Sequence, residues 1–123
     1  MYVREPTYEV SYMFKRILVP VDGSSHSIRA LNVALDFAKR YGSIIVAFIV
    51  DDGNAGPVDK VYELVESTAR RAGASVEFKV AKLDPTTSTS TLIIEEISRG
   101  SYDLVIISAR GRTVYPDLII GSV

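Results

Sequence analysis

Short, continuously apolar runs alternate along the chain with longer segments in which apolar residues recur every three or four positions. The short runs are typical of strands buried on both faces of a sheet, and the recurring stripes are typical of helices with one face on a core. Strands are predicted at 16–21, 43–50, 75–81 and 104–107, and helices at 28–38, 58–72 and 92–99. This alternation of strand and helix predicts a three-layer α/β/α domain, doubly wound around a parallel sheet.

Helix ends are marked by small residues. Gly42, Gly73 and Gly100 each follow a predicted helix, at the position that glycine fills without steric cost. Ser24 or Ser25 can cap the start of the first helix with its hydroxyl oxygen.

Two segments fit the alternation less well. The polar stretch 84–91 consists mostly of Ser and Thr, which favours a connecting loop, with a phosphorylated segment as the alternative. Residues 1–14 place apolar and polar side chains alternately, which is the pattern of an edge strand, although a tail is equally consistent with it. We therefore expect an extension at 1–14 and one domain at 15–123.

Composition narrows the classes of function. The chain has 123 residues, enough for one domain, and its net charge of −1 without blocks of like charge argues against nucleic-acid binding. No apolar run approaches the ~18–20 residues of a membrane span, and no secretory signal is present in the first fourteen residues, so we expect a cytoplasmic protein. The absence of cysteine and the single histidine exclude disulfides, thiolate sites and histidine-cluster zinc sites.

Candidate chemistry lies where the predicted strands end, because open α/β sheets bind ligands at the carboxyl ends of their strands. The exit of the last strand is the most informative one. There Ser108-Ala109-Arg110-Gly111 is followed, after nine further residues, by Gly121-Ser122. Glycines let backbone N–H groups approach phosphate oxygens, and a neighbouring hydroxyl adds a side-chain donor.

This spacing resembles the nucleotide motif of the universal stress protein family, Gly-x2-Gly-x9-Gly-Ser/Thr. The segments 15–24 and 103–107 are similar to the family's first strand and to the strand before its phosphate loop, so the resemblance covers residues 14–123. It implies a small cytoplasmic protein with a five-stranded parallel sheet, commonly a homodimer, that either binds ATP or has lost this capacity.

The resemblance also implies site residues. Asp22, with Pro20 and Val21 before it, would lie near the adenosine, and Ile49 would give backbone contacts to adenine. The expected ribose and phosphate contacts are Ser108, Gly111, Gly121 and Ser122. Arg110 and Arg112 could clamp phosphate, or they could be solvated loop residues. For Asp22 the local alternative is a turn carboxylate that caps the helix at Ser24.

The chain departs from the family pattern in its phosphate loop. Ser108 replaces the first glycine, and Val114, followed by Tyr115 and Pro116, replaces a later one. A β-branched residue disfavours positive φ and proline removes a backbone donor, so these changes weaken the expected phosphate affinity.

The family's last helix and fifth strand are expected to be absent, because the sequence stops at Val123. Their loss would leave the strand at 104–107 as an exposed apolar edge. We expect residues 7–13 of the same molecule or of a partner to cover it.

The remaining polar residues do not predict catalysis. Asp51-Asp52 favour a solvated turn over a magnesium site, so any Mg²⁺ would arrive with ATP, and His26 is predicted to be an exposed helix residue. No phosphate-binding Gly-Lys loop or nucleophile elbow is present. The sequence therefore predicts an ATP-binding regulatory module of the stress response. The alternatives are a member that acts through protein contacts without nucleotide, and a weak ATPase.

Overall fold

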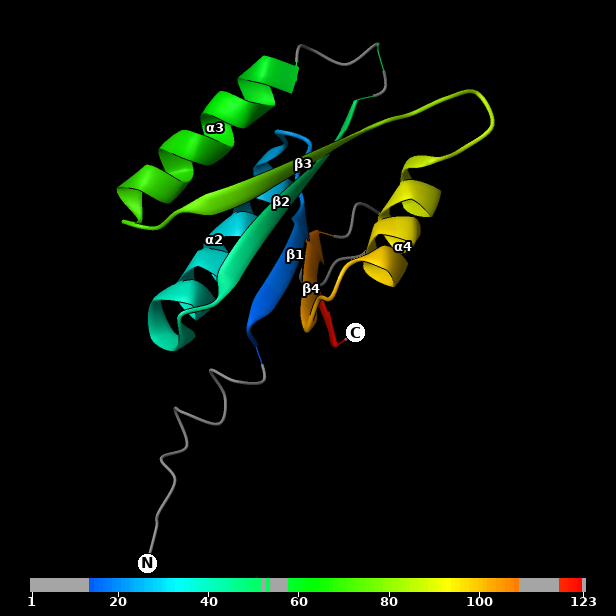
Figure 1. Cartoon of the computed structure of the whole chain (residues 1–123). Helices are drawn as coiled ribbons and strands as arrows, with labels where there is room; N and C mark the ends of the chain where they lie inside the picture. Colours follow the sequence, from blue (N-terminus) through cyan, green and yellow to red (C-terminus); the bar gives the residue numbers. More distant parts are fainter. Residues whose placement is uncertain (1–13, 52, 54–57, 109–117, 123) are drawn as a thin grey trace, which may run out of the picture.

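The protein is a three-layer α/β/α sandwich around one five-stranded sheet (Figure 1). The computed structural model describes residues 14–51, 53, 58–108 and 118–122. The strands are β1 (Arg16–Pro20), β2 (Ile44–Asp51), β3 (Val76–Lys82), β4 (Leu104–Ser108) and β5 (Leu118–Ser122). The helices are α2 (Ser25–Tyr41), α3 (Val58–Arg71) and α4 (Thr89–Arg99). The four strands and three helices predicted between residues 16 and 107 are confirmed, which establishes the α/β class.

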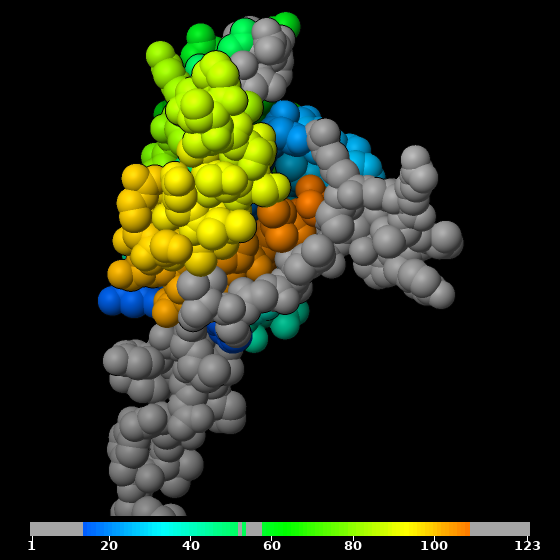
Figure 2. All heavy atoms as spheres, turned by 90° about the vertical axis from the view of Figure 1, so that its right-hand side faces the viewer, coloured from blue at the N-terminus to red at the C-terminus, as the bar shows by residue number. Residues whose placement is uncertain are grey.

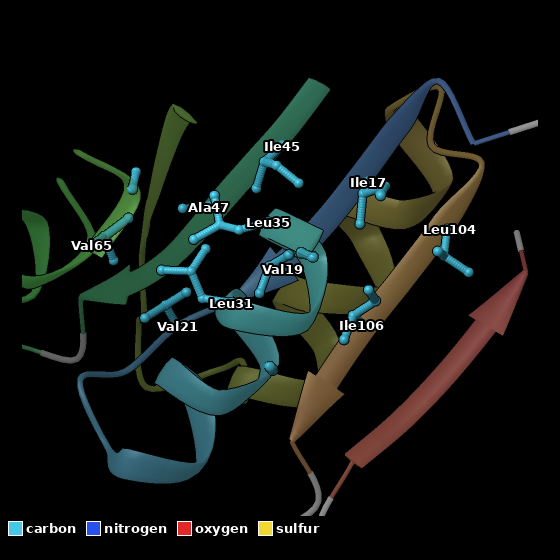
Figure 3. Close-up of a cluster of buried hydrophobic side chains, with 13 residues drawn as sticks. Ile17, Val19, Val21, Leu31, Leu35, Ile45, Ala47, Val65, Leu104 and Ile106 are labelled. Carbon is cyan, nitrogen blue, oxygen red and sulfur yellow. The ribbon is translucent and has the colours of Figure 1, made fainter. Parts of the chain in front are cut away.

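The strand order is β3-β2-β1-β4-β5, with β1 to β4 parallel. Because β1 lies in the middle, Ile17, Leu18 and Val19 are fully buried. Side chains alternate across a strand, so these three residues supply both faces of the sheet. Ile17 and Val19 belong to the core under α2 and α3, where Leu31 and Leu35 point at the sheet (Figure 3). Leu18 belongs to the core under α4.

Helix boundaries follow from capping hydrogen bonds. Ser24, and not Ser25, caps α2, because its Oγ accepts the Ser27 N–H at 3.2 Å. Gly42 ends this helix at φ 69°, in the left-handed region that glycine favours. The helix α4 begins at Thr89, three residues earlier than predicted, because Ser88 Oγ accepts the Thr91 N–H at 3.1 Å. A hydroxyl-rich loop thus becomes the first turn of a helix.

The fifth strand differs from the one in the family pattern, which follows a last helix and was expected to be absent. Instead, Leu118–Ser122 forms β5, which pairs antiparallel with β4 (Figure 3). A parallel fifth strand needs a crossover of about a dozen or more residues, usually a helix, and residues 109–117 are too few for it. The segment that follows this connection can therefore pair with β4 only in the antiparallel direction.

The expected role of residues 7–13 is also wrong. β4 has β1 on one side and β5 on the other, so it is not the open edge that residues 7–13 were expected to cover. Residues 7–13 themselves lie outside the described part of the chain. Within that part, no helix has the length and apolar character needed to cross a membrane.

Candidate functional site

A cavity of about 520 Å³ opens at the carboxyl ends of the central strands. Its lining comes from three strand ends and from the first turns of α2, α3 and α4. The lining residues are Pro20, Val21, Asp22, Ser27, Phe48, Ile49, Val50, Asp51, Val58, Val61, Thr89, Ser90, Ile93, Ile107 and Ser108. The cavity thus has apolar walls and a few polar groups, which is the usual make-up of a small-molecule site.

The topology explains why the cavity forms here. The chain leaves β1 toward the face that α2 and α3 cover, whereas it reaches β4 from α4 on the other face. The strand order changes direction between β1 and β4, and such a switch point is where open α/β sheets bind ligands at the carboxyl ends of their strands. Figure 2 views the α4 face, with β4 emerging beside the helix.

Asp22 is held by the turn that follows β1. Its Oδ1 accepts the Ser24 N–H at 2.9 Å, and its own N–H donates to Ser27 Oγ at 3.3 Å. Gly23 makes this turn possible at φ 86°. The local interpretation of Asp22 as a turn carboxylate is therefore confirmed. Asp22 is also one of the residues that line the cavity, so the turn holds this carboxylate at the rim of the site.

Asp51 also serves a turn, since its Oδ1 accepts the Gly53 N–H at 3.0 Å. Together with Asp22 it supplies negative charge, and the described lining contains no lysine, arginine or histidine. Such a lining suits hydroxyl groups and hydrogen-bond donors better than phosphate. Within the described ranges, no three His, Cys, Asp or Glu residues come together in a way that could hold a metal ion.

Half of the predicted site residues meet at this cavity. These are Pro20, Val21, Asp22, Ile49 and Ser108. Arg110, Gly111 and Arg112 lie outside the described residues, as do Asp52, Val114, Tyr115 and Pro116.

Gly121 and Ser122 lie in β5 opposite Val105 and Leu104, at the start of β4, whereas the cavity lies at the end of that strand. Along β4, the positions opposite them are three or more residues from Ser108, which corresponds to about 10 Å. Their contact with phosphate stays a prediction, and this backbone register argues against it.

The helical side of the cavity was not predicted from the sequence. Val58 and Val61 come from the start of α3, and Thr89, Ser90 and Ile93 from the start of α4. These residues could have been found from the connectivity, because a helix that follows a strand begins at the same rim of the sheet where that strand ends. His26, predicted to be exposed, is partly buried in the first turn of α2 and does not line the cavity.

A second polar cluster lies under α4, away from the cavity. Glu96 is 5% exposed, and its Oε2 accepts hydrogen bonds from Tyr102 Oη at 2.6 Å and from Lys79 Nζ at 2.8 Å. Burial raises the pKa of Glu96, but the two hydrogen bonds and the positive charges of Lys79 and Arg99 lower it, and the net pKa lies below its ordinary value. The hydrogen bond to Glu96 raises the pKa of Lys79. The cluster is an ion pair that anchors α4 to β3.

Comparison with known proteins agrees with the topology. The family model described as "Universal stress protein family" matches residues 13–123. The chain belongs to the universal stress protein family. A universal stress protein of Methanocaldococcus jannaschii is 24% identical over 125 residues, which is 90% of this chain and 74% of that protein.

Solved structures of universal stress proteins share the fold. A family member from Burkholderia pseudomallei is 20% identical, with a TM-score of 0.59 over 77% of this chain and 81% of its own. A universal stress protein in complex with cAMP is 18% identical, with a TM-score of 0.61 over 75% of this chain and 70% of its own.

Proposed function

We propose that this universal stress protein binds an adenine nucleotide, in particular ATP, and acts as a regulatory module in the cytoplasm. The observation that carries the proposal is the cavity at the β1–β4 switch point, where five residues expected from the sequence meet. A structural relative crystallised with cAMP adds support. Occupancy would act by shifting the protein toward the conformation that binds the nucleotide better, including its proposed homodimer.

The lining divides the ligand into two parts. The apolar walls around Ile49, Val61 and Ile107 suit a flat base, and the carboxylate of Asp22 suits ribose hydroxyls. The described lining offers phosphate no cation, so we assign the phosphates to the side of Ser108, where Arg110 and Arg112 follow in the sequence. Any Mg²⁺ would accompany the phosphates.

The test is a binding titration of the full chain with ATP, cAMP and adenosine, each with and without Mg²⁺. Asp22→Asn removes the charge and keeps an acceptor for the Ser24 N–H. We expect it to weaken binding of all three ligands about tenfold or more, the loss of one charged hydrogen bond. Asp84→Asn is the matched control, because Asp84 Oδ1 accepts the Thr86 N–H at 2.7 Å in a similar exposed turn that does not line the cavity.

A second candidate function is a family member that acts through protein contacts without nucleotide. The position of Gly121 and Ser122 favours this candidate, because the register of β5 pairs both residues with the start of β4, at the opposite end of that strand from the cavity. Saturable ATP binding that Asp22→Asn weakens would argue against this candidate. Equal and negligible binding by the wild-type chain and both variants would reject the nucleotide site. Phosphate release in proportion to protein, abolished by Asp22→Asn, would indicate a weak ATPase.

A further inference from the structure

The outer edge of β3 carries a row of backbone groups without a partner strand in the described part of the chain. The Leu83 N–H donates to Asp51 O at 2.8 Å, which shows that odd-numbered residues turn their backbone groups toward β2. Successive residues of a strand direct these groups to opposite sides. Val76, Phe78, Val80 and Lys82 therefore direct their N–H and C=O groups outward.

The side chains along this edge are apolar on one face and charged on the other. Val80 is 52% exposed, and Phe78 stacks on the 41% exposed ring of Tyr62 with centroids 4.1 Å apart. On the opposite face, the side chains of Glu77 and Lys79 are 60% and 47% exposed. An edge of this length with exposed apolar residues is a template for another strand.

From this pattern we infer that β3 of a second copy of the chain pairs antiparallel with this edge, with Phe78 opposite Phe78. The outward N–H and C=O groups of Phe78 then bond to those of its copy, and those of Val76 to those of Val80. Between them, Glu77 of each copy faces Lys79 of the other, at the closer spacing of a pair that exchanges no backbone bonds. This inference goes beyond the proposed function and does not depend on nucleotide binding.

Charge selects this register over its neighbours. Only every second residue of β3 directs its backbone groups outward. One copy can therefore shift along the other only in steps of two residues. A step in one direction places Lys79 opposite Lys79, and a step in the other places Glu77 opposite Glu77. Like charges directly opposite each other destabilise a strand pair, whereas opposite charges stabilise it. The chosen register has two attractive pairs, related by the twofold axis at Phe78.

Both side chains already take part in ion pairs. Lys79 Nζ lies 2.8 Å from Glu96 Oε2, and because an ammonium group has three N–H donors it can also bond to a second carboxylate. Glu77 Oε2 lies 3.9 Å from the Arg16 guanidinium. Each contact between the copies would therefore extend a charge network that the single chain already contains.

A proline substitution at Val80 tests the backbone pairing. Val80→Pro removes an outward N–H and leaves the bonds from β3 to β2 intact, since those come from odd-numbered residues. Val80→Thr keeps the N–H and the β-branched shape, and is the control. By sedimentation equilibrium we expect the wild type and Val80→Thr to be dimers and Val80→Pro to be a monomer with an unchanged circular dichroism spectrum.

A charge series tests the register. Glu77→Lys places two lysine pairs across the edge and is expected to weaken the dimer about tenfold or more, whereas Glu77→Gln should weaken it less. A wild-type chain that stays monomeric would overturn the inference and leave the edge to a strand of another protein. A dimer that withstands both Val80→Pro and Glu77→Lys would overturn it as well, because the copies would then meet elsewhere.

Discussion

Glu96 and Tyr102 show how single residues set the stability of the α4 face. Glu96 is buried, its partner Tyr102 belongs to the core cluster that includes Leu18 and Leu92, and two donors converge on the same carboxylate oxygen. A buried carboxylate that loses a donor has no water to replace it. The Tyr102 hydroxyl is therefore worth more than a hydroxyl at the surface.

We predict that Tyr102→Phe lowers the free energy of unfolding at pH 7 by about 1.5–3 kcal/mol, the cost of removing a hydrogen bond to a charged group. Urea denaturation measures this change. Tyr62→Phe is the control, because the Tyr62 ring is exposed and the same change there should cost less than about 0.5 kcal/mol. Equal losses in the two variants would contradict the role of the Glu96 contact.

The pH dependence follows from the same group. The folded pKa of Glu96 lies below its ordinary value near 4.5, so its contribution to stability is complete above that value and is lost as the pH falls through the folded pKa. Tyr102→Phe removes one of the bonds that lower this pKa. We therefore predict that the stability difference between the wild type and Tyr102→Phe shrinks below pH 4.5, as urea denaturation at a series of pH values would show. A stability difference that stays constant with pH would contradict the role of Tyr102 in lowering the pKa of Glu96.

Gly100 is required for space and not for backbone conformation. Its φ is −86°, but a Cβ there would lie 2.1 Å from Tyr102 Cε2. We predict that Gly100→Ala costs about 1–3 kcal/mol, because the ring must shift. Gly42→Ala is the comparison, since φ is 69° and no atom lies within 4 Å, so only the backbone cost of about 1 kcal/mol remains. A smaller loss for Gly100→Ala in thermal denaturation would show that the ring moves freely.

At the scale of elements, α4 depends on its first turn. The hydroxyl of Ser88 satisfies a backbone donor that the helix itself leaves open, and the helix then brings Thr89 and Ser90 to the cavity. Capping thus connects the stability of the helix with the shape of the site.

We predict that Ser88→Ala lowers the free energy of unfolding by about 1 kcal/mol. The control is Ser98→Ala, an exposed residue inside the same helix, where less than about 0.5 kcal/mol is expected. Chemical denaturation of both variants measures the two changes in the free energy of unfolding. An equal loss in Ser88→Ala and Ser98→Ala would contradict the capping role of Ser88.

At the scale of the whole molecule, the site exists only because distant segments meet. β1, β2 and β4 contribute strand ends, and three helices contribute their first turns. Ligand binding to the folded state alone must then stabilise the entire domain.

We predict that ATP at about one hundred times its dissociation constant stabilises the folded protein by about 2.7 kcal/mol. Differential scanning calorimetry should show a rise in melting temperature for the wild type and for Asp84→Asn. Asp22→Asn should require a higher ATP concentration for the same rise. A melting temperature that ATP leaves unchanged in all three proteins would contradict the proposed function.

Much of the fold could be predicted because its signals are local. The continuous apolar run of β1 indicates a buried strand, and the apolar stripe of α2 indicates a helix, each within a few residues. The family resemblance named Asp22 and Ile49 as site residues, and both line the cavity at the strand ends, where a topological rule predicts a ligand. The helical lining around Val61 was missed because it depends on which helix starts next to which strand.

The apolar run 118–120 could not be placed from its own residues, because a strand of either direction has the same composition. Its antiparallel pairing was decided by the short connection at 109–117 and by the free side of β4. The sequence by itself determined the order and type of β1 to β4 and of the three helices, since hydrophobic period and capping residues act within one element. Only the tertiary structure decided where Gly121 and Ser122 lie and which edge stays open, because strand pairing satisfies backbone groups between segments that are distant in the chain.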